Sequence, residues 1–130
     1  MGNVFNINHL RNLNLSELLK GSNAPKLLEI DLNNTGLSNL SLGRKEYLRN
    51  FDISNCNQLT SAVSLANCSN LETVIADNSS IPSITLPENA NIKKLSLKNC
   101  IKLTSLVVKN QALLTSDNFD ISGCSSLTSL

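Results

Sequence analysis

At 130 residues, of which 41% are hydrophobic, the chain is long enough for one domain with a buried core. A formal net charge of +1 with only 16% charged residues gives no general attraction to nucleic acid, and three Phe, one Tyr and no Trp leave little surface for base stacking. No run approaches the roughly 18 apolar residues of a membrane span. We therefore expect no nucleic acid partner and no membrane insertion.

Residues 1–26 form a degenerate version of a pattern that recurs later in the chain. Their apolar residues are spaced as in a short strand followed by a turn. Asn14, with Glu17 three residues later, is typical of a helix start, so we expect a short helix over residues 15–20. An atypical terminal repeat of this kind is expected of a capping coil.

Residues 27–130 repeat one pattern, L-x-x-L-x-L-x-x followed by a small residue. It is clearest at Leu95 and Leu97, which alternate with polar residues as in a half-buried strand. The equivalent strand positions are Ile30, Phe51, Val74, Leu95 and Phe119. Successive members of this set are 21, 23, 21 and 24 residues apart. A single repeat of this length cannot bury its leucines, so we predict a solenoid in which parallel strands stack about 4.8 Å apart.

A second apolar triplet follows each first strand, so each coil is expected to carry two short extended segments and little helix. Three of these triplets begin at Leu37, Ile81 and Leu103. In the remaining coil the register slips by one residue, which places Val63 and Leu65 in the second segment. We also predict one helical turn over residues 111–118.

Three of the four cysteines, Cys56, Cys100 and Cys124, occupy the same position of the repeat. Because this position lies inside a stacked solenoid, we expect their thiols to be reduced and buried. A disulfide or a metal site between stacked cysteines is the alternative, but a whole coil separates Cys56 from Cys100. Cys68 lies in a connecting segment and is the cysteine that we expect to be accessible.

The outward positions of the strands form three columns that are almost entirely polar, and one hypothesis is that they make a recognition face for a protein or a glycan. The candidate ligand-binding residues are Glu29, Asp31, Asp52, Asp77, Lys94 and Lys98. The alternative is a solvated surface whose polar residues keep the chain soluble. Calcium binding by Asp31 and Asp52 is a weaker hypothesis, because no continuous ligand loop surrounds them. A further column, Asn34, Asn55, Asn78 and Asn99, is interpreted as turn-forming rather than ligand-binding.

The sequence offers little for catalysis. His9 is the only histidine and lies in the degenerate first coil, and neither a nucleophile elbow nor a phosphate-binding glycine loop is present. Asp31 and Asp52 resemble a carboxylate pair, but adjacent coils produce such pairs by repetition alone. We therefore predict that the chain is not an enzyme and holds no cofactor and no metal.

The recurring segment L-x-x-L-x-L-x-x-(N or C), in forms of 11 and 12 residues, resembles the one that defines leucine-rich repeats, over roughly residues 4–130. Residues 81–87 (IPSITLP) and 118–130 (NFDISGCSSLTSL) resemble the BspA-like leucine-rich repeats. This resemblance implies a β-rich leucine-rich repeat solenoid with a parallel sheet, about five to six coils of 21–25 residues and little helix. It also implies a location at a cell surface, in a secreted protein or on a phage particle.

Two interpretations of function follow. The first is a non-enzymatic interaction module that presents a polar parallel-sheet face to a protein or a glycan, within a larger surface or virion-associated protein. The second is a right-handed parallel β-helix that acts on polysaccharide, which should show three strands per coil. Two strand segments per coil favour the first. Because the chain stops inside a repeat at Leu130, we also expect its C-terminal end to be covered by further repeats or by another chain.

Overall fold

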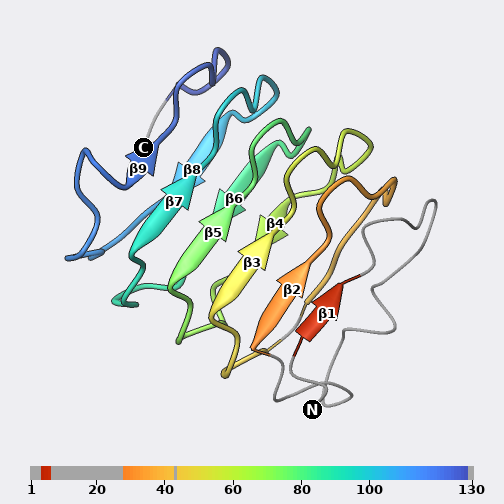
Figure 1. The fold of residues 1–130 in the computed structure, drawn as a ribbon. Helices are drawn as coiled ribbons and strands as arrows, with labels where there is room; N and C mark the ends of the chain where they lie inside the picture. The colour runs from red at the N-terminus through yellow and green to blue at the C-terminus, as the bar shows by residue number, and fades with distance from the viewer. Residues whose placement is uncertain (1–3, 7–27, 43, 129–130) are drawn as a thin grey trace.

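The computed structural model describes residues 4–6, 28–42 and 44–128, and over these residues the protein is a parallel β-solenoid without a helix. The chain makes four complete turns between the strand at Glu29 and the strand at Phe119 (Figure 1). The predictions of a repeat solenoid, a parallel sheet and little helix are confirmed. The count of complete turns is slightly below the expected five to six coils, because most of the predicted N-terminal coil, including its helix, lies outside the described residues.

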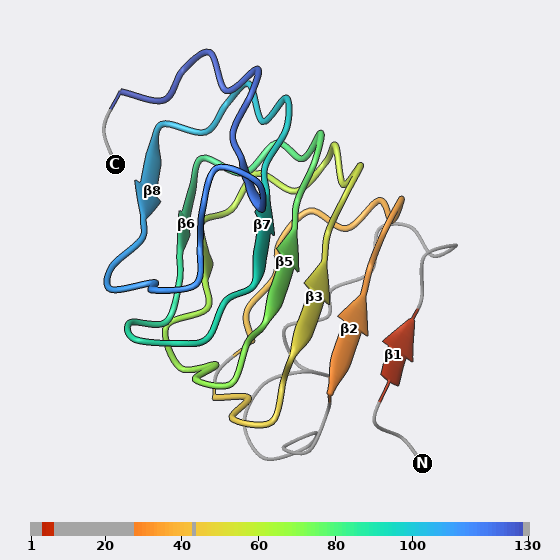
Figure 2. The same ribbon diagram turned by 60° about the vertical axis from the view of Figure 1, so that its left-hand side comes forward.

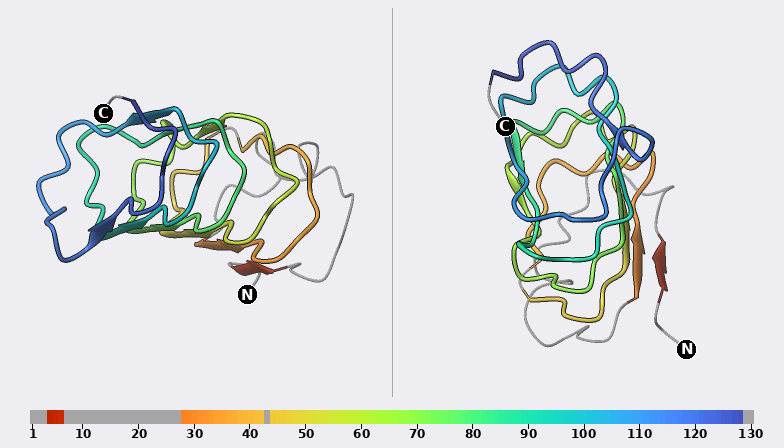
Figure 3. Two further views of the ribbon diagram at one scale, coloured as in Figure 1. Left: turned by 90° about the horizontal axis from the view of Figure 1, so that it is seen from above. Right: turned by 90° about the vertical axis from the view of Figure 1, so that its left-hand side faces the viewer.

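Nine short strands in this part of the chain build two sheets that lie on opposite sides of the stacked coils (Figures 2 and 3). We call the larger one the charged sheet. In spatial order it contains β1 (Val4–Asn6), β2 (Glu29–Asp31), β3 (Asn50–Asp52), β5 (Thr73–Ile75), β7 (Lys94–Ser96) and β9 (Phe119–Asp120). We call the smaller one the hydroxyl sheet. It contains β4 (Val63–Ser64), β6 (Ser83–Thr85) and β8 (Ser105–Val107).

The register of the charged sheet follows the sequence repeat. Ile30 pairs with Phe51, Phe51 with Val74, Val74 with Leu95, and Leu95 with Phe119. These are the equivalent positions that the spacing predicts. Insertions of two or three residues are therefore absorbed in the corners, and the ladder of the sheet stays in step.

One continuous core runs along the axis of the solenoid. Leu32, Ile53, Ala76 and Leu97, which follow the strands of the charged sheet in four successive coils, are each fully buried and belong to this core. Apolar side chains at a fixed point of each coil thus pack on those of the coils above and below. A single coil could not remove this apolar surface from water, so stacking is what stabilises the repeat.

The hydroxyl sheet contains the second extended segment of the three coils that follow β3, β5 and β7, whereas in the coil that follows β2 Leu40 and Leu42 are buried but form no strand. Val63 pairs with Ile84, and Ile84 pairs with Leu106. This pairing confirms the one-residue slip that places Val63 in the second segment. Its side chain and those of Ile84 and Leu106 are buried in the same core that the charged sheet covers from the other side.

Turn-forming asparagines end the strands of the charged sheet. Asn34, Asn55, Asn78 and Asn99 have φ angles of 65°, 61°, 62° and 59°, in the left-handed region that Asn adopts more readily than other side chains. In the last coil Gly123 takes this position with a φ of 79°. A Cβ atom there would lie 2.2 Å from Asn99 Oδ1, so glycine leaves room for the amide below it. The turn-forming interpretation of the column is confirmed.

The cysteine column is buried as expected at two of its three positions. Cys56 and Cys100 are fully buried, whereas Cys124 in the last described coil is half-buried. All four cysteines are free thiols. Equivalent positions in the intervening coils hold Thr35 and Ser79, which are also buried.

The expectation that Cys68 is accessible is wrong. Its side chain is fully buried, and its N–H donates to Leu65 O at 3.0 Å in a turn that returns the chain from the hydroxyl sheet into the core. Lys45 and Ala90 occupy comparable corners of neighbouring coils and are buried too. This corner therefore forms a second inward-pointing column, which the spacing of the leucines did not reveal.

The helical turn expected over residues 111–118 is also wrong. The segment consists of consecutive turns, in which Asn118 N donates to Thr115 O at 3.2 Å and Leu114 N donates to Gln111 O at 3.3 Å. Asn118 Oδ1 accepts a hydrogen bond from Thr115 N at 2.6 Å, so side-chain bonding replaces a continued helical ladder. Among the described residues, no helix is long and apolar enough to cross a bilayer.

Candidate functional site

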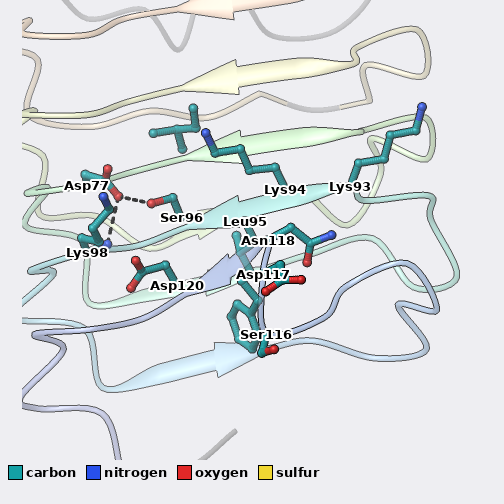
Figure 4. A pocket seen from close by; sticks show the side chains of 12 residues that line it. Asp77, Lys93, Lys94, Leu95, Ser96, Lys98, Ser116, Asp117, Asn118 and Asp120 are labelled. Carbon is teal, nitrogen blue, oxygen red and sulfur yellow. Dashed lines mark hydrogen bonds between the residues drawn. The ribbon is translucent and has the colours of Figure 1, made fainter.

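The outer face of the charged sheet carries two adjacent grooves. The larger has a volume of about 660 Å³ and lies over β5, β7 and β9, with residues 116–118 of the segment before β9 along one side (Figure 4). The smaller has a volume of about 210 Å³ and lies over β2, β3 and β5. Ile75 lines both grooves, so together they form one strip that crosses the strands.

The six predicted site residues all lie on this face, but the structure divides them. Asp77, Lys94 and Lys98 line the larger groove. Glu29 and Asp52 line the smaller one. Asp31 pairs in register with Asp52 but lines neither groove. The sequence predicts acidic groups around Glu29, Asp31, Asp52 and Asp77, with the lysines further along, but the structure places Asp77 in the same groove as Lys94 and Lys98.

Several of the acidic side chains hold the turns that follow their strands. Asp31 Oδ1 accepts the N–H of Asn33 at 3.1 Å, Asp52 Oδ1 accepts that of Ser54 at 2.8 Å, and Asp120 Oδ1 accepts that of Ser122 at 2.9 Å. Each carboxylate thus bonds the backbone two residues ahead, as Asx turns do. One role of these aspartates is therefore structural, whatever the outer carboxylate oxygen binds.

The coil of β7 has Ser96 where β2, β3 and β9 have aspartate, and it obtains a carboxylate from the coil below. Asp77 Oδ1 accepts the hydroxyl of Ser96 at 2.7 Å and the N–H of Lys98 at 2.9 Å. Both bonds are visible in Figure 4. Asp77 therefore links the coil of β5 to the coil of β7 by hydrogen bonds beneath the larger groove.

Lys93, Lys94 and Lys98 also line the larger groove. Lys98 lies between Asp77 and Asp120 (Figure 4), and hydrogen bonding by Ser122, with a smaller contribution from the Lys98 charge, holds the pKa of Asp120 below its usual value. Lys93 Nζ is 3.8 Å from Glu72 Oε1. Lys94 is exposed, and among the described residues no ion pair involves its ammonium group. Among the lysines of this groove, Lys94 thus contributes least to the interactions that hold the fold together.

Ile75 was not among the predicted site residues, although its position carried a signal. It is the apolar member of a middle column that otherwise holds Asp31, Asp52, Ser96 and Asp120 in the described strands. Its side chain is half-buried. An apolar residue facing outward from a polar sheet is the kind of exception that marks a contact surface.

Lys45 is the second residue whose place the sequence did not reveal. It is fully buried, and its Nζ donates to Leu42 O at 2.6 Å. Burial lowers the pKa of this lysine, because desolvation disfavours its charged form. Lys45 lies at the corner beyond the hydroxyl sheet, away from both grooves, so its role is in the fold rather than in the candidate site.

The described residues contain no group of three or more His, Cys, Asp or Glu side chains placed to hold a metal ion. Chemically, the strip offers carboxylates at one end, an apolar contact in the middle, and lysines together with aspartates at the other. Such a surface can dock a partner by charge and by shape. Comparison of the chain with protein-family models, with curated proteins and with solved structures found no match.

Proposed function

We propose that the chain is a non-enzymatic interaction module that binds an extended segment of a partner protein across the outer face of the charged sheet. The observation that carries this proposal is the position of Ile75, the only apolar outward residue in β2, β3, β5, β7 and β9, where the two grooves meet. Apolar anchors near the centre of an interface, surrounded by polar contacts, dominate the free energy of binding.

The charges on either side of Ile75 indicate the order of groups on the partner. Glu29 and Asp52 lie over β2 and β3, and Lys94 lies over β7. Strands about 4.8 Å apart place these charges within reach of neighbouring side chains on an extended peptide. The complementary partner segment carries a basic residue for Glu29 and Asp52 and an apolar residue for Ile75, followed by groups of both charges, because aspartates line the larger groove beside its lysines.

The lining of the grooves supports a protein partner over a glycan. Sugar rings commonly pack on aromatic faces, but the two aromatic residues that line the grooves, Phe51 and Phe119, pack against the core rather than standing at outward positions. Asp31, Asp52 and Asp120 each commit one oxygen to a turn, which also favours docking over carboxylate-assisted cleavage of polysaccharide. The resemblance to BspA-like leucine-rich repeats supports a place in a larger surface or virion-associated protein.

The proposal is tested by panning random linear peptides displayed on phage against the immobilised protein. Enriched peptides are then measured against Ile75→Asp and against Thr85→Asp, which places the same charge on an outward position of the hydroxyl sheet. We expect Ile75→Asp to weaken binding by tenfold or more, which is about 1.4 kcal/mol, and Thr85→Asp to leave it within twofold. Circular dichroism and melting temperature confirm that both variants are folded.

Two results would overturn the proposal. Peptides that bind wild type and Ile75→Asp equally would show that the strip is not the binding surface. Release of reducing ends from a panel of polysaccharides incubated with the purified protein would show that the chain is an enzyme, and binding to a glycan array without peptide binding would replace the protein partner by a glycan.

A further inference from the structure

The small-residue column beside the charged sheet brings side chains of successive coils into direct contact. Thr35 Oγ1 lies 3.4 Å from Cys56 Sγ, and Ser79 Oγ lies 3.6 Å from Cys100 Sγ. In each of these two contacts a hydroxyl group lies beneath a thiol. Cys56 and Cys100 therefore do not touch each other, since the coil that contains Ser79 lies between them.

Each thiol also makes the same contact with the backbone of the coil below. Cys56 Sγ donates to Leu32 O at 3.1 Å, Cys100 Sγ donates to Ala76 O at 3.0 Å, and Cys124 Sγ donates to Leu97 O at 3.0 Å. The three sulfur atoms thus occupy one place relative to the coil beneath. Cys124 accordingly stands over Cys100 as Cys100 stands over Ser79.

The backbones of these last two coils are held in register. Leu97 N donates to Asp120 O and Asn99 N donates to Ser122 O, both at 2.8 Å. Neighbouring strands of a sheet lie about 4.8 Å apart, and disulfides join residues whose Cα atoms are roughly 4.4–6.8 Å apart. In the part of the column that the structure describes, Cys100 and Cys124 are the one pair of cysteines in adjacent coils.

We propose that Cys100 and Cys124 form a disulfide that joins the last two described coils when the protein meets a low-molecular-weight disulfide such as oxidised glutathione. The thiolate of Cys124 attacks one sulfur of the oxidant, which forms a mixed disulfide and releases one glutathione thiol. Cys100 then attacks the Cys124 sulfur and releases the second glutathione. Two protein thiols are oxidised, one oxidant disulfide is reduced to two thiols, and the two protein protons are taken up by the released thiols.

Exposure sets the order of these steps. Cys124 is half-buried and can be reached, whereas Cys100 is fully buried. Burial raises the pKa of both thiols above the ordinary value of 9.0. Because the thiolate is the attacking species, oxidation should be slow at neutral pH and should accelerate as the pH rises toward 9.

The disulfide would close the chain from residue 100 to residue 124. This loop contains β8 and residues 116–118, which line the larger groove. Cross-linking restricts the unfolded chain and should raise the melting temperature, by roughly 5 °C or more for a domain of this size. The pairing itself does not depend on the proposed binding function.

The test counts free thiols after incubation with oxidised glutathione at pH 8.5, followed by unfolding in denaturant, and measures mass and melting temperature. Wild type starts with four thiols, and we expect it to retain two, to lose 2 Da as a monomer and to melt at a higher temperature. Cys56→Ser is the matched control and should also lose two thiols. Cys124→Ser should form no internal disulfide, and serine is compatible with this column because Ser79 already occupies it.

Three outcomes would overturn the inference. Wild type could retain all four thiols while Cys124 reacts with a maleimide, or Cys124→Ser could still form an internal disulfide. Peptide mapping could also find the oxidised pair elsewhere, at Cys56 or Cys68. Because Cys56→Ser and Cys124→Ser remove the same group from the same column, a difference between them reports on pairing rather than on folding.

Discussion

The two sheets of the solenoid cover the same core, but their outer faces differ. Outward positions of the charged sheet carry aspartate, glutamate and lysine, whereas those of the hydroxyl sheet are Ser64, Ser83, Thr85, Ser105 and Val107. In the strands from β2 onward, both sheets place one apolar residue per strand in the core or against it. Burial therefore constrains the inward positions equally and leaves the outward ones free to differ.

The difference between the two outer faces arises partly because some of the polar residues stabilise the fold. On the charged sheet, aspartates hold the turns after the strands, and left-handed Asn residues follow in four successive coils. On the hydroxyl sheet, left-handed Asn occurs at Asn89 and Asn110, and the next inward column holds the unlike residues Lys45, Cys68 and Ala90. Regular corners thus accompany the longer and more regular sheet.

The largest effect should come from truncating equivalent core leucines beneath the two sheets. Leu95 pairs with strands on both sides, whereas Leu106 in β8 pairs with β6 alone among the described residues. We expect Leu95→Ala to lower the free energy of unfolding by about 3–5 kcal/mol and Leu106→Ala by about 2–3 kcal/mol, because a site near the end of a sheet can collapse around the cavity.

Urea unfolding followed by circular dichroism measures both, with Ser64→Ala as a surface control expected within about 0.5 kcal/mol of wild type. A larger loss for Leu106→Ala than for Leu95→Ala would mean that the hydroxyl sheet, not the charged one, dominates the core.

The next largest effect should come from alkaline pH, which should distinguish the stability contribution of the inward column of Cys68 from that of the cysteine column beside the charged sheet. Burial raises the pKa of the Cys68 thiol, beyond the hydroxyl sheet, from 9.0 to about 11. The folded state therefore keeps a proton that the unfolded state releases, so this contribution is complete below about pH 9 and is lost as the pH rises through 11. Full loss amounts to roughly 2–3 kcal/mol.

The measurement compares the urea midpoints of wild type and Cys68→Ala between pH 8 and pH 11. Wild type should lose more stability than the variant over this range. Parallel pH profiles of the two proteins would rule out Cys68 as the titrating group, and Cys56→Ala tests whether the cysteine column beside the charged sheet contributes as well.

The smallest effect should distinguish the corners of the two sheets. Asn55 Nδ2 donates to Asn33 Oδ1 at 3.3 Å, and Asn55 Oδ1 accepts from Asn78 Nδ2 at 3.1 Å. Asn89 has the same φ of 61°, but its side chain makes no hydrogen bond to the residues that the structure describes. Replacing either by Ala should cost about 1 kcal/mol for the left-handed backbone, with an additional loss at Asn55.

Glycine variants separate the two contributions, because glycine adopts this backbone without strain. Asn89→Gly should recover the stability lost in Asn89→Ala, whereas Asn55→Gly should recover only part of it. Equal recovery at both positions in thermal melts would show that the amide ladder beside the charged sheet adds no stability.

Much of the candidate site could be predicted from the repeat, but the division of its residues between two grooves could not. The outward columns are set by the strand period of two, so all six predicted residues lie on the charged face. The sequence could not show that Asp31 lies outside both grooves, or that Asp77 reaches Ser96 in the next coil. Those facts depend on side-chain directions across coils that are 21 or more residues apart.

By itself, the sequence determined the repeat, the inward leucines, the second extended segment in three of the four described turns and the column of turn-forming asparagines, because each follows from local period and local backbone preference. Only the tertiary structure decided that Cys68 is buried and that residues 111–118 form turns rather than a helix. It also decided that Ile75 lies where two grooves meet. The physical reason is that corners vary in length, and the direction of a corner is set by the coils packed against it.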